Sequence, residues 1–193
     1  VCIIPQPTKD SDFTRFGKPR LAFLVNSGNI DSMVAHYTAA KKRRSDDAYT
    51  PGGKAGKRPD RAVIVYTKKL RELFGNVPIA IGGVEASLRR FAHYDYWDDR
   101  VRPSILLDST ADLLMYGMGE RHIAEIAHRL DKGEKITDLT DIKGTCYAVN
   151  SNEYKPIKGA VECPSFEIVS ENNEKSKRQY AISTRIQQEE HDA

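Results

Sequence analysis

The sequence predicts an α/β fold in which helices flank a mostly parallel sheet. Three short apolar runs, at 21–25, 77–81 and 112–116, each lead into a glycine-containing turn, and a helical pattern follows each turn. Runs that are apolar without interruption are typical of parallel strands buried on both faces. The repeated order of strand, glycine turn and helix therefore favours a parallel sheet whose turns emerge at one edge.

The first half of the chain shows helix signals around the first of these strands. Asp31 or Asn29 is suited to cap a helix, and Pro59 stands where the first turn of a helix accepts proline. The residues Val63–Val65 alone would suit a strand, but the wider spacing of apolar residues favours a helix there. The expected elements are helices over 10–16, 31–40 and 59–75 and a strand over 21–25.

The second half continues the alternation and then becomes irregular. Gly133 is a suitable stop for the helix that follows the third strand. Ser165 could cap a last, polar helix. The expected elements are a strand over 77–81, a helix opening after Gly83, a short extended segment over 104–107, a strand over 112–116, a helix over 120–130, a strand-like piece over 145–149 and a helix over 165–190.

Composition places the chain among soluble globular proteins. Of 193 residues, 39% are hydrophobic and 30% are charged, and the net charge of +3 is mildly basic. No run approaches the roughly 18 apolar residues of a membrane-spanning helix, and the N-terminus does not resemble a signal peptide. We therefore predict a cytoplasmic protein without membrane contact. The residues 1–5 look like the interior of a strand without an approach to it, which indicates a chain cut from a longer one.

The glycine turns are the predicted cofactor-binding edge. Glycine lets a ligand approach the backbone, and the start of a helix offers N–H donors. Close packing of a helix on a strand selects glycine equally well. Neither Gly-x-Gly-x-x-Gly nor a phosphate-loop motif occurs, which disfavours a standard dinucleotide or triphosphate site. The candidate residues are Ser27, Gly28, Asn29, Gly82, Gly83, Glu85, Gly117 and Gly119.

A second candidate region follows the middle turn, where aromatic and ionisable residues are concentrated. Such residues are depleted from ordinary interiors, so we interpret them as a functional rim that binds substrate or an anion. The arginines would hold an anion and the aromatic rings would stack or pack, while a hydrogen-bonded network that only holds the loop is the structural alternative. The rim consists of Arg89, Arg90, His93, Tyr94, Asp95, Tyr96 and Trp97.

The basic segment 41–61 interrupts the alternation of strands and helices. It could pair with phosphates of a cofactor or of nucleic acid. Asp46 and Asp47 beside the charge run argue for internal pairing, and Tyr37 and Tyr49 are the sparse aromatic residues nearby. A charge run is usually a solvated face, so nucleic-acid binding is open but not favoured.

Five motifs of the chain are long and specific: Asn29–Val34, His36–Ala39, Lys42–Gly53, Gly82–Arg90 and Ala92–Trp97. Together they resemble the N-terminal region of YgiQ-like radical-SAM proteins, and the resemblance covers nearly the whole chain. It implies a flavodoxin-like, cobalamin-binding-like parallel sheet at 1–135, truncated at its N-terminus. It also implies an extension at 136–193 with short strands and a helix that leads to a radical-SAM core.

The same resemblance implies a cofactor set for the full-length protein. That protein would hold a 4Fe-4S cluster by three thiolates and cleave S-adenosylmethionine reductively to a radical that abstracts hydrogen from substrate. The cluster motif Cys-x-x-x-Cys-x-x-Cys is absent here, so Cys2, Cys146 and Cys163 inherit no ligand role and no metal site is predicted. The resemblance leaves cobalamin open, because the Asp-x-His-x-x-Gly loop is absent too.

The leading hypothesis is an accessory domain of a radical S-adenosylmethionine enzyme, not catalytic by itself, that shares a pocket with the core domain of the same chain. The substrate is unknown. One alternative is a non-catalytic binding module for RNA or another phosphate-rich partner. The other is a scaffold whose loop, including Trp97, only docks on its own core.

Overall fold

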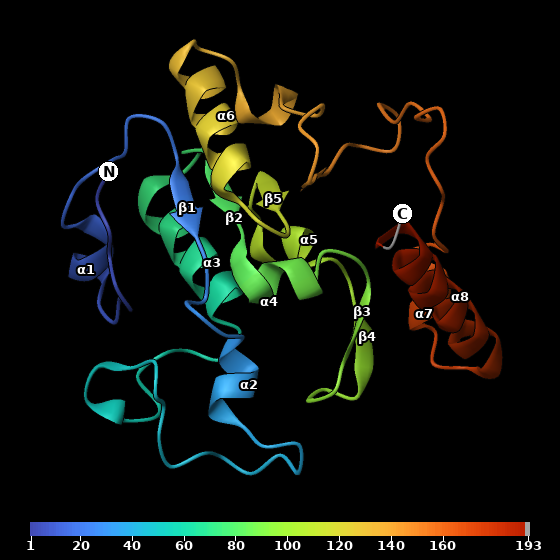
Figure 1. Cartoon of the computed structure of the whole chain (residues 1–193), viewed down its shortest axis with the longest axis horizontal. Coiled ribbons are helices and arrows are strands. Elements are labelled where there is room, and N and C mark those ends of the chain that lie inside the picture. The colour runs from blue at the N-terminus through green and yellow to red at the C-terminus, as the bar shows by residue number, and fades with distance from the viewer. Residues whose placement is uncertain (192–193) are drawn as a thin grey trace. The chain divides into compact units, whose positions relative to one another are not determined.

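The computed structural model describes residues 1–191, which form two compact units (Figure 1). The first unit comprises residues 1–90 and 105–148, and the second comprises residues 91–104 and the chain from 149 onward. The division after residue 135 that the sequence suggests stays a prediction. No helix within the described residues is long and apolar enough to cross a membrane.

The first unit is built on a mixed sheet of four strands in the order β1-β2-β5-β6. The first three are parallel, with Val25 in register with Ile81, and Ile81 in register with Leu114. The last strand runs antiparallel to its neighbour. The parallel core and its helices confirm the predicted α/β fold class. The strands are β1 (Phe23–Val25), β2 (Ile79–Ile81), β5 (Leu113–Met115) and β6 (Thr145–Tyr147).

Helices follow the strands of the first unit in sequence, as βαβ units require. The helix after the first strand is short, and a long loop separates it from the helix that leads back to the sheet. These elements are α1 (Asp10–Thr14), α2 (Ser32–His36), the 3-10 turn η1 (Pro51–Gly53), α3 (Ala62–Phe74), α4 (Gly83–Leu88), α5 (Ile105–Ser109), α6 (Glu120–Asp131) and the 3-10 turn η2 (Ile136–Asp138).

Strand β2 separates two apolar cores. Ile79 and Ile81 belong to the core that contains Val63 of α3, whereas Ala80 belongs to the core that contains Ile126 of α6. Side chains alternate between the two faces of a strand, so helices cover both faces of the sheet. All three residues of β2 are buried. This is why an uninterrupted apolar run encodes the strand.

The second unit contains a β-hairpin and two helices. The hairpin pairs Tyr94 with Val101, and no pattern in the sequence predicts it. The break between the two helices contains Asn172, whose φ of 55° lies in the left-handed region. The elements are β3 (His93–Asp95), β4 (Arg100–Arg102), α7 (Phe166–Ser170) and α8 (Glu174–His191).

Four predicted elements are wrong in kind or extent. The helix predicted over 59–75 begins at Ala62, because Arg61 has a left-handed φ of 52°, so Pro59 precedes the helix. The segment 104–107 is not extended but begins α5, where Ile105, Leu106 and Ser109 are buried at helical spacing. The helix predicted over 31–40 ends at His36, because Tyr37 is extended and bridges Arg43. The single helix predicted over 165–190 is two helices.

Candidate functional site

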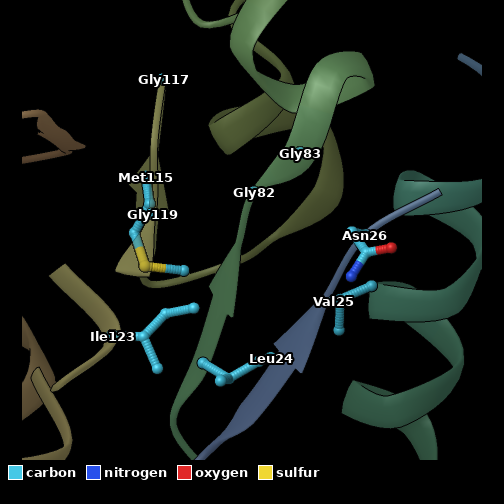
Figure 2. A pocket seen from close by; sticks show the side chains of 9 residues that line it. All are labelled: Leu24, Val25, Asn26, Gly82, Gly83, Met115, Gly117, Gly119 and Ile123. Carbon is cyan, nitrogen blue, oxygen red and sulfur yellow. The ribbon is translucent and has the colours of Figure 1, made fainter. Parts of the chain in front are cut away.

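The carboxyl ends of the three parallel strands surround one open pocket of about 170 Å³ (Figure 2). The turns after β1, β2 and β5 all contribute to it, which confirms that they share an edge. Ligand pockets for drug-sized molecules usually enclose about 300 to 1,000 Å³, so this pocket by itself covers only part of a ligand. Its lining consists of Leu24, Val25, Asn26, Gly82, Gly83, Met115, Gly117, Gly119 and Ile123.

Packing explains glycine at position 83 more strongly than at position 82. A Cβ on Gly83 would lie 3.2 Å from Cβ of Asn26, which is a tight contact, and Gly83 has a φ of 78°, which favours glycine. A Cβ on Gly82 would lie 3.4 Å from the carbonyl oxygen of Met115, close to an ordinary contact distance, and Gly82 is extended. The packing explanation therefore accounts for Gly83 without a ligand.

Gly117 and Gly119 differ from that pair. A Cβ on Gly117 would meet no atom within 4 Å, and one on Gly119 would meet only Cδ1 of Ile123, at the ordinary contact distance of 3.8 Å. Met118 between them is 80% exposed. The turn after β5 is thus the side of the pocket at which backbone lies open to an incoming group.

The other predicted cofactor residues do not line the pocket. Glu85 is 1% exposed, and its two carboxylate oxygens accept hydrogen bonds from the amides of Ser32 and Val63, at 2.9 and 3.0 Å. Ser27 is buried and its hydroxyl donates to the carbonyl of Ile30. Gly28 and Asn29 are exposed. Asn26, which the sequence analysis omits, contributes to the lining instead.

Arg89 and Arg90 lie in the first unit and contact groups of the protein. Arg89 forms an ion pair with the buried carboxylate of Asp31, which also caps α2 as predicted. The guanidinium of Arg90 lies 5.0 Å from the ring centre of Tyr116 and donates to the carbonyl of Ser87. An anion at either arginine would have to share it with these partners.

The remaining rim residues, from His93 to Trp97, lie in the second unit. Asp95 accepts hydrogen bonds from the amides of Trp97 and Asp98, at 2.9 and 3.1 Å, and so fixes the hairpin turn. The phenol of Tyr94 donates to Asp99, and this hydrogen bond raises the pKa of Tyr94. His93 Nδ1 lies 3.2 Å from the carbonyl oxygen of Phe91.

The hairpin also presents aromatic rings to solvent. Tyr94 in β3 and Tyr96 in the turn that follows it are 47% and 54% exposed. The amide of Tyr94 donates to the phenol of Tyr180 in α8, at 2.8 Å. The hydrogen bonds of Asp95 therefore hold the hairpin together, and Tyr94 and Tyr96 supply its exposed aromatic surface.

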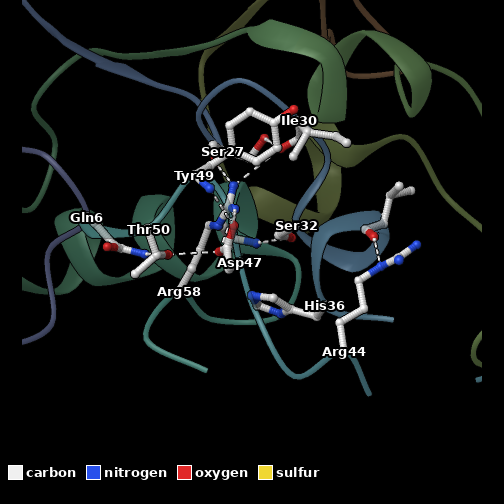
Figure 3. A network of polar contacts seen from close by, with 12 residues as sticks. Gln6, Ser27, Ile30, Ser32, His36, Arg44, Asp47, Tyr49, Thr50 and Arg58 are labelled. Carbon is white, nitrogen blue, oxygen red and sulfur yellow. Dashed lines mark hydrogen bonds and ion pairs between the residues drawn. The ribbon is translucent and has the colours of Figure 1, made fainter. Parts of the chain in front are cut away.

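Sequence reasoning missed a buried polar network beneath the basic loop (Figure 3). The carboxylate of Asp47 accepts hydrogen bonds from Arg58 at 2.8 and 3.0 Å, and both side chains are buried. Arg58 also donates to the carbonyl of Ser27, at 2.7 Å. In the sequence, Asp47 beside the charge run predicts internal pairing, but it does not identify Arg58 as the partner.

A second group of polar contacts, among His36, Tyr37 and Asp60, holds the end of α2. Nδ1 of the buried His36 lies 2.6 Å from a carboxylate oxygen of Asp60, and the phenol of Tyr37 donates to the other oxygen at 2.7 Å. Burial by itself raises the pKa of Asp60, but the hydrogen bonds from Tyr37 and His36 outweigh it and hold the pKa below its usual value. This cluster joins the C-terminal end of α2 to the segment that precedes α3.

The three cysteines differ in exposure. Cys2 is exposed, whereas Cys146 in β6 and Cys163 are partly buried. Burial raises the pKa of Cys146 to about 11. Within residues 1–191, no three His, Cys, Asp or Glu side chains converge as metal ligands would.

The fold and the pocket define an α/β domain with an open pocket at the carboxyl ends of its parallel strands. The chain belongs to the Radical SAM N-terminal family, which it matches over residues 1–193. This membership confirms the resemblance seen in the motifs.

Curated relatives match this chain over almost all of its length. The chain is 56% identical over 195 residues to a UPF0313 protein of Clostridium botulinum, covering all of this chain and 30% of that protein. It is 52% identical over 189 residues to one of Geobacter sulfurreducens, covering 97% of this chain and 31% of the relative. The chain thus spans about 30% of the length of these relatives. No solved structure matches it.

Proposed function

We propose that this chain is the accessory domain of a radical S-adenosylmethionine iron-sulfur protein and that its glycine-turn edge forms one wall of a pocket completed by the rest of the protein. The observation that carries the proposal is the convergence of the three strand-to-helix turns on one open pocket. In parallel sheets, this edge is where ligands bind. Family membership supports the radical-SAM context, and the substrate is unassigned.

The chain's own residues would bind and orient a ligand. Leu24 and Ile123 supply apolar surface to the pocket, and the backbone at Gly117 and Gly119 supplies open main chain. Because the pocket is small and open, it would contact one face of a ligand while the remaining protein covers the other. Cluster and S-adenosylmethionine would be held outside this chain.

The radical-SAM part of the proposal is tested with the protein expressed in full under anaerobic conditions. We expect the visible absorbance of a 4Fe-4S cluster and release of 5'-deoxyadenosine when S-adenosylmethionine and a reductant are added. A protein that binds iron and sulfide but releases no 5'-deoxyadenosine would contradict the proposal.

The role of the pocket is tested by filling it. Leu24 is 48% exposed and lines the pocket, so Leu24→Trp would block it without disturbing a buried core. Leu107 is 61% exposed, lies in α5 and does not line the pocket, so Leu107→Trp is the matched control. We expect Leu24→Trp alone to slow 5'-deoxyadenosine release at unchanged cluster absorbance. Equal rates in both variants would exclude a role for the pocket.

A further inference from the structure

The loop of residues 41–58, between α2 and α3, presents an excess of positive charge. Figure 1 shows it as a lobe that leaves α2 and returns to α3 with little regular structure of its own. Among these residues, all of which the structure describes, Asp46 is the one exposed acidic side chain. The exposed basic side chains are Lys41, Lys42, Arg43, Arg44, Lys54 and Lys57.

The acidic residues next to the lobe are engaged with other groups of the protein. Asp47 is 2% exposed and pairs with Arg58, which is itself 6% exposed. The side chain of Asp60 is 41% exposed and binds His36 and Tyr37 at the C-terminal end of α2. The internal pairing predicted from the aspartates beside the charge run is present at Asp47, but its partner is the buried Arg58, so the exposed basic side chains of the lobe still outnumber the exposed acidic ones.

Hydrogen bonds to buried side chains hold the lobe in place, although it has little regular structure. The hydroxyl of Thr50 donates to Asp47 at 2.8 Å and accepts from Gln6 at 2.7 Å, while Asp47 also accepts from the amide of Tyr49 (Figure 3). Backbone bridges join Tyr37 to Arg43 and Asp46 to Lys54. A surface fixed in this way loses less conformational entropy when a partner binds than a free basic tail does.

We propose that this lobe, residues 41–58, is a binding surface for single-stranded nucleic acid. Its lysines and arginines match a phosphate backbone, and positive charge of this density contributes affinity that does not depend on base sequence. Tyr49 lies within the same lobe and is 52% exposed, which gives a base a ring on which to stack. This binding is separate from the pocket at the sheet edge and does not depend on the radical-SAM proposal.

The test measures binding of a fluorescent 20-nucleotide RNA to the protein expressed in full, over a series of salt concentrations. The variant Lys54→Glu/Lys57→Glu reverses two exposed charges of the lobe. The control Lys155→Glu/Lys158→Glu makes the same change, at the same spacing, on exposed residues of the second unit. Circular dichroism checks that both variants fold.

We expect the lobe variant to lower affinity at 0.1 M salt by at least about tenfold and to reduce the slope of log affinity against log salt by about 1.4, since each phosphate contact on a single strand contributes about 0.7. The control should bind as the parent does. Equal losses in both variants, or an affinity that does not depend on salt, would overturn the proposal. Polyglutamate that displaces the RNA at equal charge concentration would also overturn it, in favour of an acidic protein partner.

Discussion

Arg58 reaches Asp47 inside the first unit, where Nη2 lies 2.8 Å from one carboxylate oxygen and 3.0 Å from the other. The two side chains are 5% and 1% exposed. Nη1 of the same arginine donates to the carbonyl of Ser27 in the turn after β1. One guanidinium thereby joins the basic lobe to the edge of the sheet, so the order of the lobe depends on this pair.

Removing one partner of this pair should be costly. Asp47→Ala leaves the Arg58 charge buried without its carboxylate, and breaking a buried pair in this way usually costs about 3–5 kcal/mol. Urea unfolding of the parent and the variant measures the loss. The control is Arg20→Ala, because Arg20 and Asp131 pair at the surface with side chains 77% and 52% exposed, and such pairs contribute about 1 kcal/mol or less. Equal losses in the two variants would contradict a buried role for Asp47.

Acid should weaken the first unit through Asp60. The pKa of this group is lower in the folded protein than its ordinary value, because hydrogen bonds from Tyr37 and His36 outweigh the opposing effect of burial. The unfolded chain therefore binds the proton more tightly. The stabilisation is present above about pH 4, the ordinary pKa of aspartate, and is lost as the pH falls through the lower folded value.

Asp60→Asn removes this titration. Its free energy of unfolding should be lower than that of the parent at pH 6 and should fall less steeply towards acid pH, as measured by urea unfolding at each pH. Asp46→Asn, at an exposed position in the same lobe, should follow the parent's pH dependence. An unchanged pH dependence in Asp60→Asn would show that the cluster of His36 and Tyr37 does not depress this pKa.

The shared edge of the sheet could be predicted from the sequence because its signals are local. Each apolar run is followed directly by its glycine turn, and the rule that parallel strands present their carboxyl ends together then brings Gly82 and Gly117 to one pocket. The cap at Asp31 is local in the same sense, since its carboxylate accepts from amides two and three residues further on. Patterns within a few residues carry this information.

The polar contacts of the site could not be predicted in the same way, because their partners are distant in sequence. Glu85 contacts an amide 53 residues away at Ser32, and His36 contacts Asp60 24 residues away. No periodicity encodes such pairs. The extended segment predicted at 104–107 failed for a related reason, since burial of Ile105 and Leu106 in the core beside α3 determines that it is helical.

The packing role of Gly83 can be separated from its backbone conformation. Gly83→Ala and Gly133→Ala both place a side chain at positive φ, 78° and 91°, which costs about 1–2 kcal/mol. Only the first also brings a Cβ to 3.2 Å from Asn26, whereas the second meets nothing within 4 Å. We expect Gly83→Ala to be the more destabilising variant in urea unfolding. Equal losses would mean that the strand-to-helix contact is not tight.

Glu85 should stabilise the fold through the hydrogen bonds that its carboxylate accepts, and not by binding a ligand. Glu85→Gln replaces one acceptor oxygen by an amide donor, so the amide of either Ser32 or Val63 loses its partner, at a cost of about 1–3 kcal/mol. Glu125→Gln, at an exposed position of α6, should change stability by less than about 0.5 kcal/mol. If Glu85→Gln were as stable as the parent, the carboxylate would not be needed for the fold and a role in binding would regain support.

Two tyrosines of the first unit should respond in opposite directions to loss of the hydroxyl. Tyr66 is buried and its hydroxyl has no hydrogen-bond partner among residues 1–191, whereas the hydroxyl of Tyr37 donates to Asp60 at 2.7 Å. Tyr66→Phe should therefore raise the free energy of unfolding at pH 7 by about 1 kcal/mol, and Tyr37→Phe should lower it by about 1–3 kcal/mol. Burial raises the pKa of Tyr66 to about 12, so the unfolded chain loses the phenolic proton first, and the parent loses stability as the pH rises from about 10 towards that value. Tyr66→Phe should lose less stability than the parent over this range, and a variant destabilised at pH 7 would instead indicate that the hydroxyl has a partner, such as an internal water.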